Sequence, residues 1–133
     1  MNIKDLEAIM EAEPVLNTIG FGLGNCTTYK NLEERRAALA DHRDALRKQI
    51  DTCAKVAAWL EENARPRKTI NRNDSSYGWK HIVEKEIGKY VSNGAFIAAA
   101  IHSGFKFTAE GGYCPNAYFN IRTYKPGDVA ARI

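Results

Sequence analysis

The chain has 133 residues, of which 44% are apolar, and a formal net charge of +3. This length fits one domain, or one small module with a helical extension, and the apolar content suffices for a core. No apolar run reaches the roughly 18 residues that span a bilayer, which excludes a membrane-spanning class. Residues 1–7 are charged and lack the apolar stretch of a secretion signal, so we expect a cytoplasmic protein.

Charge is distributed unevenly along the chain. Residues 1–64 carry 8 Lys and Arg against 11 Asp and Glu, a net charge of −3, whereas residues 65–133 carry 11 against 5, a net charge of +6. The C-terminal half is therefore the candidate surface for a polyanion. The alternative is an ordinary solvated surface.

Cysteine and histidine spacing argues against metal and disulfide chemistry. Cys26, Cys53 and Cys114 are odd in number and far apart, which fits neither a disulfide framework nor a zinc motif. The histidines lack ligand-like partners at short range, and spacing fixes no nucleophile, base and orienting group. We expect no cofactor, no metal and no enzyme activity.

The N-terminal region, residues 1–64, is predicted to be helical. Residues 3–10 have the periodicity of a short amphipathic helix that ends before Pro14. Residues 20–25 are too rich in glycine for regular structure. From about residue 31 to residue 64 there is no glycine or proline, and the pattern predicts one helix of roughly 50 Å.

The long helix carries a partial coiled-coil seam. Apolar residues recur every seven positions from Leu32 through Leu46 and Cys53, and Ile50 lies on a second apolar line. Two arginines interrupt that second line, so a continuous seam begins only after Leu46. We expect either a homodimer through Leu46, Ile50 and Cys53, or packing of this face against the same chain.

Residues 65–74 are predicted to be a basic linker. The long helix should end near Arg65, because a residue before proline is pushed out of the helical region. Residues 65–72 then carry four positive charges and no negative one: Arg65, Arg67, Lys68 and Arg72. Such an arm points first to nucleic acid.

Residues 75–124 have the layout of a winged helix-turn-helix module, followed by a tail at 125–133. One helix should begin near Ser75 and end at Gly88, and Ser92 or Asn93 should cap a second one. Strands are predicted at residues 105–108 and 117–121, joined by a wing loop. The expected fold class is thus α+β and mostly helical, with a long N-terminal helical extension before this module.

Several strings in this module resemble small proteins carried by phages and other bacterial mobile elements. The strings are SSYGWKH at 75–81, YVSNGAFI at 90–97, GF at 104–105 and PNAYFN at 115–120. The resemblance covers roughly residues 68–121 and implies a mobile-element setting. It assigns no functional residue.

The second helix of the module would enter the DNA major groove in such a fold. Of its expected exposed residues, Asn93 is suited to read adenine and His102 to touch a phosphate. Further phosphate contacts are expected from Lys80, Lys89, Lys106 and Arg122. The alternating charges around Lys80 and Lys89 also fit an ordinary exposed helix face.

Aromatic residues of the C-terminal half offer a further possibility. Tyr77, Trp79, Tyr113, Tyr118, Phe119 and Tyr124 are candidates to stack single-stranded bases or to anchor an interface. We expect most of them in the core, since a small α+β module needs large side chains there.

Two functions follow from these observations. The first is a non-enzymatic, nucleic-acid-binding regulator of a phage or mobile element, with DNA as the expected partner. The second is a counter-defence inhibitor of the anti-CRISPR type, which binds a host protein complex through acidic surface. For the second function, the partner-binding residues would be the seam residues above and four acids of the long helix: Glu33, Glu34, Asp41 and Asp44.

Overall fold

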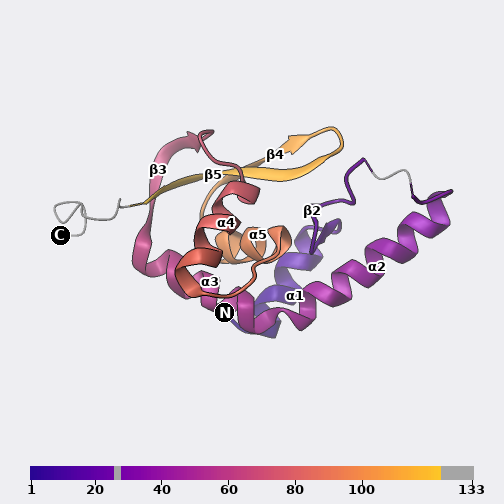
Figure 1. The fold of residues 1–133 in the computed structure, drawn as a ribbon, viewed down its shortest axis with the longest axis horizontal. Helices are drawn as coiled ribbons and strands as arrows, with labels where there is room; N and C mark the ends of the chain where they lie inside the picture. The colour runs from indigo at the N-terminus through magenta and orange to yellow at the C-terminus, as the bar shows by residue number, and fades with distance from the viewer. Residues whose placement is uncertain (26–27, 124–133) are drawn as a thin grey trace.

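A computed structural model describes residues 1–25 and 28–123 of the chain (Figure 1). In that part, five helices are present: α1 (Ile3–Ala12), α2 (Leu32–Lys48), α3 (Ile50–Asn63), α4 (Ser76–Ile87) and α5 (Asn93–His102). The strands are β1 (Leu16–Asn17), β2 (Gly20–Phe21), β3 (Ala64–Asn71), β4 (Phe107–Gly111) and β5 (Cys114–Thr123). The predicted α+β class is confirmed. No helix in the described part is long and apolar enough to cross a membrane.

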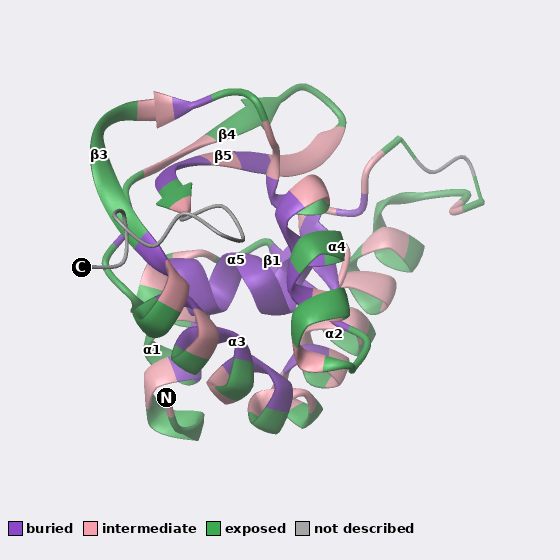
Figure 2. Ribbon diagram, turned by 60° about the vertical axis from the view of Figure 1, so that its left-hand side comes forward, coloured by how far each residue is buried: buried purple, intermediate pink, exposed green. Residues whose placement is uncertain are grey.

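Helix α5 lies at the centre of the molecule (Figure 2). Every residue from Val91 to Ala100 is buried, and α1, α3, α4, β1, β2 and β5 all contact the helix. A helix that is apolar on all sides is stable only when it is buried on all sides, which explains the central position of α5. The expectation that this helix is an exposed recognition helix is therefore wrong.

The start of α5 packs against backbone rather than side chains. The Gly94 N–H donates to the Thr18 carbonyl over 3.0 Å. A Cβ at Gly94 would lie 1.8 Å from the carbonyl oxygen of Asn17, so only glycine permits this approach. Thr18 belongs to the turn between β1 and β2, a short antiparallel pair where the glycine-rich sequence predicted no regular structure.

Strand β5 is the centre of a three-stranded antiparallel sheet in the order β3-β5-β4. The inward residues Ala117, Phe119 and Ile121 are 0% exposed, and Phe119 packs edge-on against Phe96 of α5 with ring centroids 5.9 Å apart. The opposite face of the sheet, with Tyr118 and Arg122, is turned away from the core. Within the described residues, Arg122 is exposed on this face, Tyr118 is half-buried and Asn120 is buried.

The hairpin of β4 and β5 closes more tightly than predicted. Gly111 pairs with Cys114, and Gly111 and Gly112 both have positive φ, which the turn requires. Residues 110–116 are thus strand ends and a turn instead of an extended wing loop.

The predicted long helix over residues 31–64 is two helices. α2 ends at Lys48 and α3 begins at Ile50, with Gln49 at the break (φ −92°, ψ 18°). The Ser92 hydroxyl donates to Gln49 Oε1 over 2.6 Å, which ties the break to the start of α5. The break lets α3 pack along α5 while α2 extends away from the body (Figure 1).

The residues of the predicted dimer seam lie inside this chain's own core. Leu46 and Cys53 are 0% exposed, and Ile50 packs against the same core. Because their partners are internal, the prediction of a homodimer through these residues is wrong. The alternative of packing within the chain is the one observed.

The predicted basic linker over residues 65–74 is largely a strand. β3 pairs with β5, and Arg65 lies opposite Arg122. One apolar cluster runs from Leu6 of α1 to Ile121 of β5, so the helical region and the C-terminal module share a core. The predicted tail at 125–133 lies outside the described residues.

Candidate nucleic-acid interface

Cations gather on β3, on the neighbouring strand β5 and on the loops that adjoin the sheet. We name six exposed residues the basic face: Arg65, Arg67, Lys68, Arg72, Lys106 and Arg122. In residues 1–25 and 28–123, no Asp or Glu forms an ion pair with the last five of these. Uncompensated charges of one sign make a local potential that attracts a polyanion.

A bulge in β3 displays part of the basic face. The pairing with β5 shifts register between Pro66 and Asn71, and Arg67 and Lys68 are exposed in that interval. The Asn120 side chain donates to the Arg67 carbonyl over 2.9 Å, and the Asn71 side chain donates to a β5 carbonyl over 2.9 Å. The Asn120 and Asn71 side chains thus take the place of backbone hydrogen bonds between β3 and β5 that the bulge interrupts. They hold the backbone that carries Arg67 and Lys68.

Arg65 and Arg122 are direct partners across β3 and β5. Like charges in this position destabilise a sheet. The Arg65 guanidinium donates to the carbonyls of Glu61 and Ala64, over 2.9 and 2.8 Å, which holds it at the start of the strand.

Tyr118 lies on the same side of the sheet as Arg122. The guanidinium carbon of Arg72 is 5.3 Å from the centroid of the Tyr118 ring, a cation–π contact. The Tyr118 hydroxyl donates to Glu110 Oε1 over 3.0 Å, and Cys114 Sγ donates to Glu110 Oε2 over 2.6 Å. Hydrogen bonds from Cys114 and Tyr118 lower the pKa of Glu110, and the bond to Glu110 raises the pKa of Tyr118.

Two residues predicted to contact nucleic acid are buried. Asn93 is 5% exposed, and its Nδ2 donates to the Ile19 carbonyl (2.8 Å) and to Asn116 Oδ1 (3.0 Å). Lys80 is also 5% exposed, with its Nζ 2.8 Å from Glu84 Oε1. The predictions that Asn93 reads a base in the groove and that Lys80 binds phosphate are therefore wrong, because internal partners use these groups.

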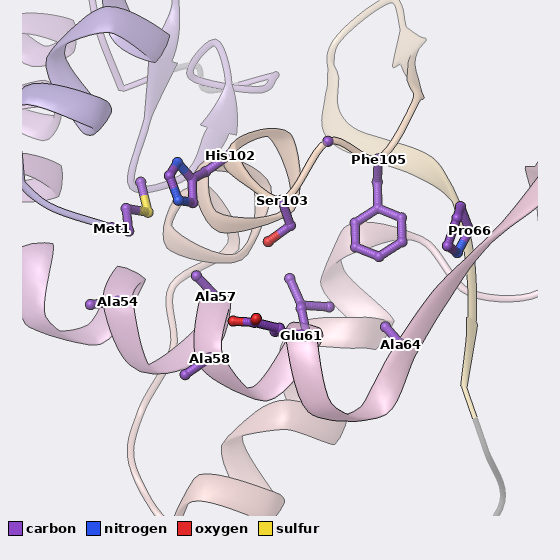
Figure 3. A pocket seen from close by; sticks show the side chains of 12 residues that line it. Met1, Ala54, Ala57, Ala58, Glu61, Ala64, Pro66, His102, Ser103 and Phe105 are labelled. Atoms are coloured by element: carbon purple, nitrogen blue, oxygen red, sulfur yellow. The ribbon is translucent and has the colours of Figure 1, made fainter. Parts of the chain in front are cut away.

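His102 and Lys89 are exposed, but they do not belong to the basic face. His102 ends α5 and lines a pocket of about 470 Å³, together with Ser103, Phe105 and alanines of α3 (Figure 3). Lys89 follows the Gly88 cap of α4. His102 shares this pocket with Ala64 and Pro66 of β3, whereas Lys89 lies at the end of α4.

A larger hollow of about 820 Å³ lies where α4, the α2–α3 break, the β1–β2 turn and the start of β5 meet. We name it the tyrosine cleft, after Tyr77 and Tyr90 in its lining. The sequence does not predict this cleft, because its residues come from distant segments and no spacing along the chain marks them. Three of the strings quoted above, at 75–81, 90–97 and 115–120, contribute to the lining.

A buried ion pair lies beside the two rings. Lys80 Nζ is 5.3 Å from the Tyr77 centroid and 4.8 Å from the Tyr90 centroid. Glu84 accepts from Lys80 Nζ (2.8 Å) and from the Val91 N–H (3.1 Å). Burial alone would raise the pKa of Glu84, but the hydrogen bonds from Lys80 and Val91 bring it below its ordinary value. The Glu84 carboxylate therefore keeps the Lys80 side chain beside the two rings.

The cleft lining also includes a buried acceptor without a donor. Asn93 Oδ1 has no hydrogen-bond partner in the described part of the chain. The amide cannot be turned round, because the Ile19 carbonyl accepts and must face the Asn93 Nδ2. An unpaired buried acceptor costs about 1–3 kcal/mol.

The four acids predicted to bind a partner are exposed on α2: Glu33, Glu34, Asp41 and Asp44. The same helix carries five cationic residues, so its net charge is +1. Asp44 pairs with Arg47 over 2.7 Å, and Glu34 accepts from the Lys30 N–H over 2.6 Å. The exposed surface of α2 is therefore mixed in charge rather than acidic.

Comparison with protein-family models, with curated proteins and with solved structures gives no significant match for this chain.

Proposed function

We propose that the protein is a non-enzymatic nucleic-acid-binding regulator of a phage or mobile element, and that it binds through the basic face. The observation that carries this proposal is the set of exposed cations without ion-pair partners in the described residues: Arg67, Lys68, Arg72, Lys106 and Arg122. Cations arranged in this way attract phosphates, and their binding releases the counterions that are condensed on the nucleic acid.

Binding of this kind positions a nucleic acid without reading a duplex sequence. The helix that would read base edges in a winged helix-turn-helix is buried from Asn93 to Ala100. Contacts from arginine and lysine to phosphates carry no direct sequence information. We therefore expect little preference among duplexes of equal length.

Charge reversal tests the proposal. The variant Arg67→Glu, Lys68→Glu, Arg72→Glu, which we name the bulge variant, reverses the charge of the two bulge cations and of the neighbouring Arg72. A matched control, Lys4→Glu, Lys48→Glu, Lys55→Glu, makes the same change in net charge at exposed positions of α1, α2 and α3. We expect the first variant to lose at least about tenfold in affinity for labelled DNA, measured by fluorescence anisotropy at low salt.

The control variant should bind nearly as well as the wild type. Equal losses in the two variants would mean that overall charge, and not the basic face, attracts the nucleic acid. Circular dichroism of both variants checks that they are folded.

A second candidate function is docking on a host protein complex through α2, as a counter-defence inhibitor. One observation favours it: in the 17 residues of α2, only Leu46 is buried, and Leu32 is 60% exposed. The variant Leu32→Ser, Glu33→Lys should abolish inhibition of a host defence in a phage-plating assay. The bulge variant should leave that inhibition intact.

A further inference from the structure

The tyrosine cleft has the features of a site for a planar ring. Tyr77 and Tyr90 are 51% and 67% exposed, although both contact the ammonium group of Lys80. Glu84 accepts a hydrogen bond from Lys80, so the group that contacts both rings has an internal partner. Exposed aromatic rings held in this way stack with unpaired nucleobases.

Amide groups for the edge of a base lie in the same cleft. Gln49 Oε1 accepts from Ser92, and Asn116 Oδ1 accepts from Asn93. The NH₂ group of each amide makes no hydrogen bond within the part of the chain that the structure describes. Asn93 Oδ1 lacks a donor there as well. Side-chain amides with free NH₂ groups match the acceptor atoms on the polar edges of bases.

The cleft adjoins the basic face along β5. Asn116 lines the cleft, and Tyr118 follows it by two residues, about 7 Å along a strand. The Arg72 guanidinium lies over the Tyr118 ring. Strand β5 thus links the cleft with the Arg72 contact. The volume of the cleft, about 820 Å³, is in the range of small-molecule sites.

We propose that the tyrosine cleft receives one unstacked base of a single-stranded nucleic acid whose backbone lies on the basic face. This inference rests on the proposed function and names its substrate class. In a duplex the bases are stacked and paired, so they cannot enter the cleft without being extruded. The protein should therefore prefer a single strand to a duplex of the same length.

The variant Tyr90→Ala tests the inference, with Tyr113→Ala as its matched control. Tyr113 is 72% exposed in the β4–β5 turn and outside the cleft lining. We expect Tyr90→Ala to weaken binding of a single strand by about five- to hundredfold. Its affinity for the duplex and the affinity of Tyr113→Ala for either probe should stay at the wild-type level. A strand that carries 2-aminopurine should change fluorescence on binding to the wild type and less on binding to Tyr90→Ala.

The two proposals fail in different ways. If Tyr90→Ala binds the single strand as tightly as the wild type, the cleft does not hold a base, while loss of binding in the bulge variant would still support the basic face. If Tyr90→Ala and Tyr113→Ala weaken single-strand binding equally, exposed aromatic surface in general is responsible and the cleft is again excluded. If the wild type binds neither probe at low salt, both proposals are wrong.

Discussion

The ion pair between Lys80 and Glu84 lies in the lining of the tyrosine cleft, beside the rings of Tyr77 and Tyr90. A buried ammonium group is tolerated because a carboxylate 2.8 Å away and two aromatic rings surround it. Removing the carboxylate charge leaves that ammonium buried without a counter-ion. We therefore expect this change to lower the stability of the fold and to alter the positions of Tyr77 and Tyr90.

We predict that Glu84→Gln lowers the free energy of unfolding by about 3 kcal/mol at pH 7. The pKa of Glu84 in the folded chain is below its ordinary value of 4.5. Its contribution is therefore complete above pH 4.5 and is lost as the pH falls through the folded pKa. Urea unfolding at several pH values should show the gap between wild type and variant closing in acid.

Glu86→Gln is the control for this series. Glu86 is exposed on α4, and its substitution should change stability little at any pH. A gap for Glu84→Gln that persists unchanged in acid would mean that shape or hydrogen bonding, rather than charge, accounts for its role.

For single residues, the sequence predicts exposed charged side chains better than buried ones. Lys85, Glu86 and Lys89 are exposed, as their alternation indicates. Lys80 and Glu84 belong to the same pattern, but their spacing of four residues lets them neutralise each other on the inward side. The winged helix-turn-helix layout predicts that Asn93 is exposed, and nothing nearby in sequence indicates that the distant Ile19 and Asn116 are its partners.

Among the elements, helix ends follow their local sequence closely. Gly88 ends α4 with φ 67°, and Ser92 caps α5 by accepting from the Ala95 N–H, both as predicted. The break at Gln49 has no such local cause, since neither glycine nor proline is present. It results from the packing of α3 on α5 and from the bond to Ser92, which is tertiary information.

Helix α5 can sit at the centre only because Gly94 has no side chain. We predict that Gly94→Ala lowers the free energy of unfolding by about 3 kcal/mol or more, because its Cβ would meet the Asn17 carbonyl at 1.8 Å. Thermal and urea unfolding measure the loss. The clash involves backbone, so a side-chain rotation cannot remove it.

Gly78→Ala provides the matched control within a helix. Its Cβ would meet only the Asp74 side chain, at 3.0 Å, which can move, and alanine favours a helix by about 1 kcal/mol. This variant should be as stable as the wild type or more stable. If Gly94→Ala were equally well tolerated, the close contact between α5 and the β1–β2 turn would not be required.

For the molecule as a whole, the sequence predicts the α+β fold class and the β4–β5 strand pair. It does not predict how the helices pack around them. The position after α4 predicts a surface helix that is capped by Ser92 or Asn93, whereas the apolar character of residues 95–101 on all sides indicates a central one. Arg65, Arg67 and Lys68 were assigned to a linker because Pro66 breaks the helix. Their pairing in an edge strand depends on β5, which follows more than 40 residues later.

The arrangement gives the molecule two different sides. Inward residues of β5 close the core, and the opposite side presents the basic face next to the tyrosine cleft. α2 extends from the body with a mixed charge. On this arrangement, we propose that cations of the basic face bind phosphates.

The most direct test is the salt dependence of single-strand binding by the full chain. Five cations without ion-pair partners in the described residues predict a slope of log affinity against log salt of about −3.5. In Lys68→Ala the slope should become less steep by about 0.7, and in Lys55→Ala it should stay unchanged. A slope near zero in the wild type, or equal slopes for the wild type and Lys68→Ala, would contradict the claim.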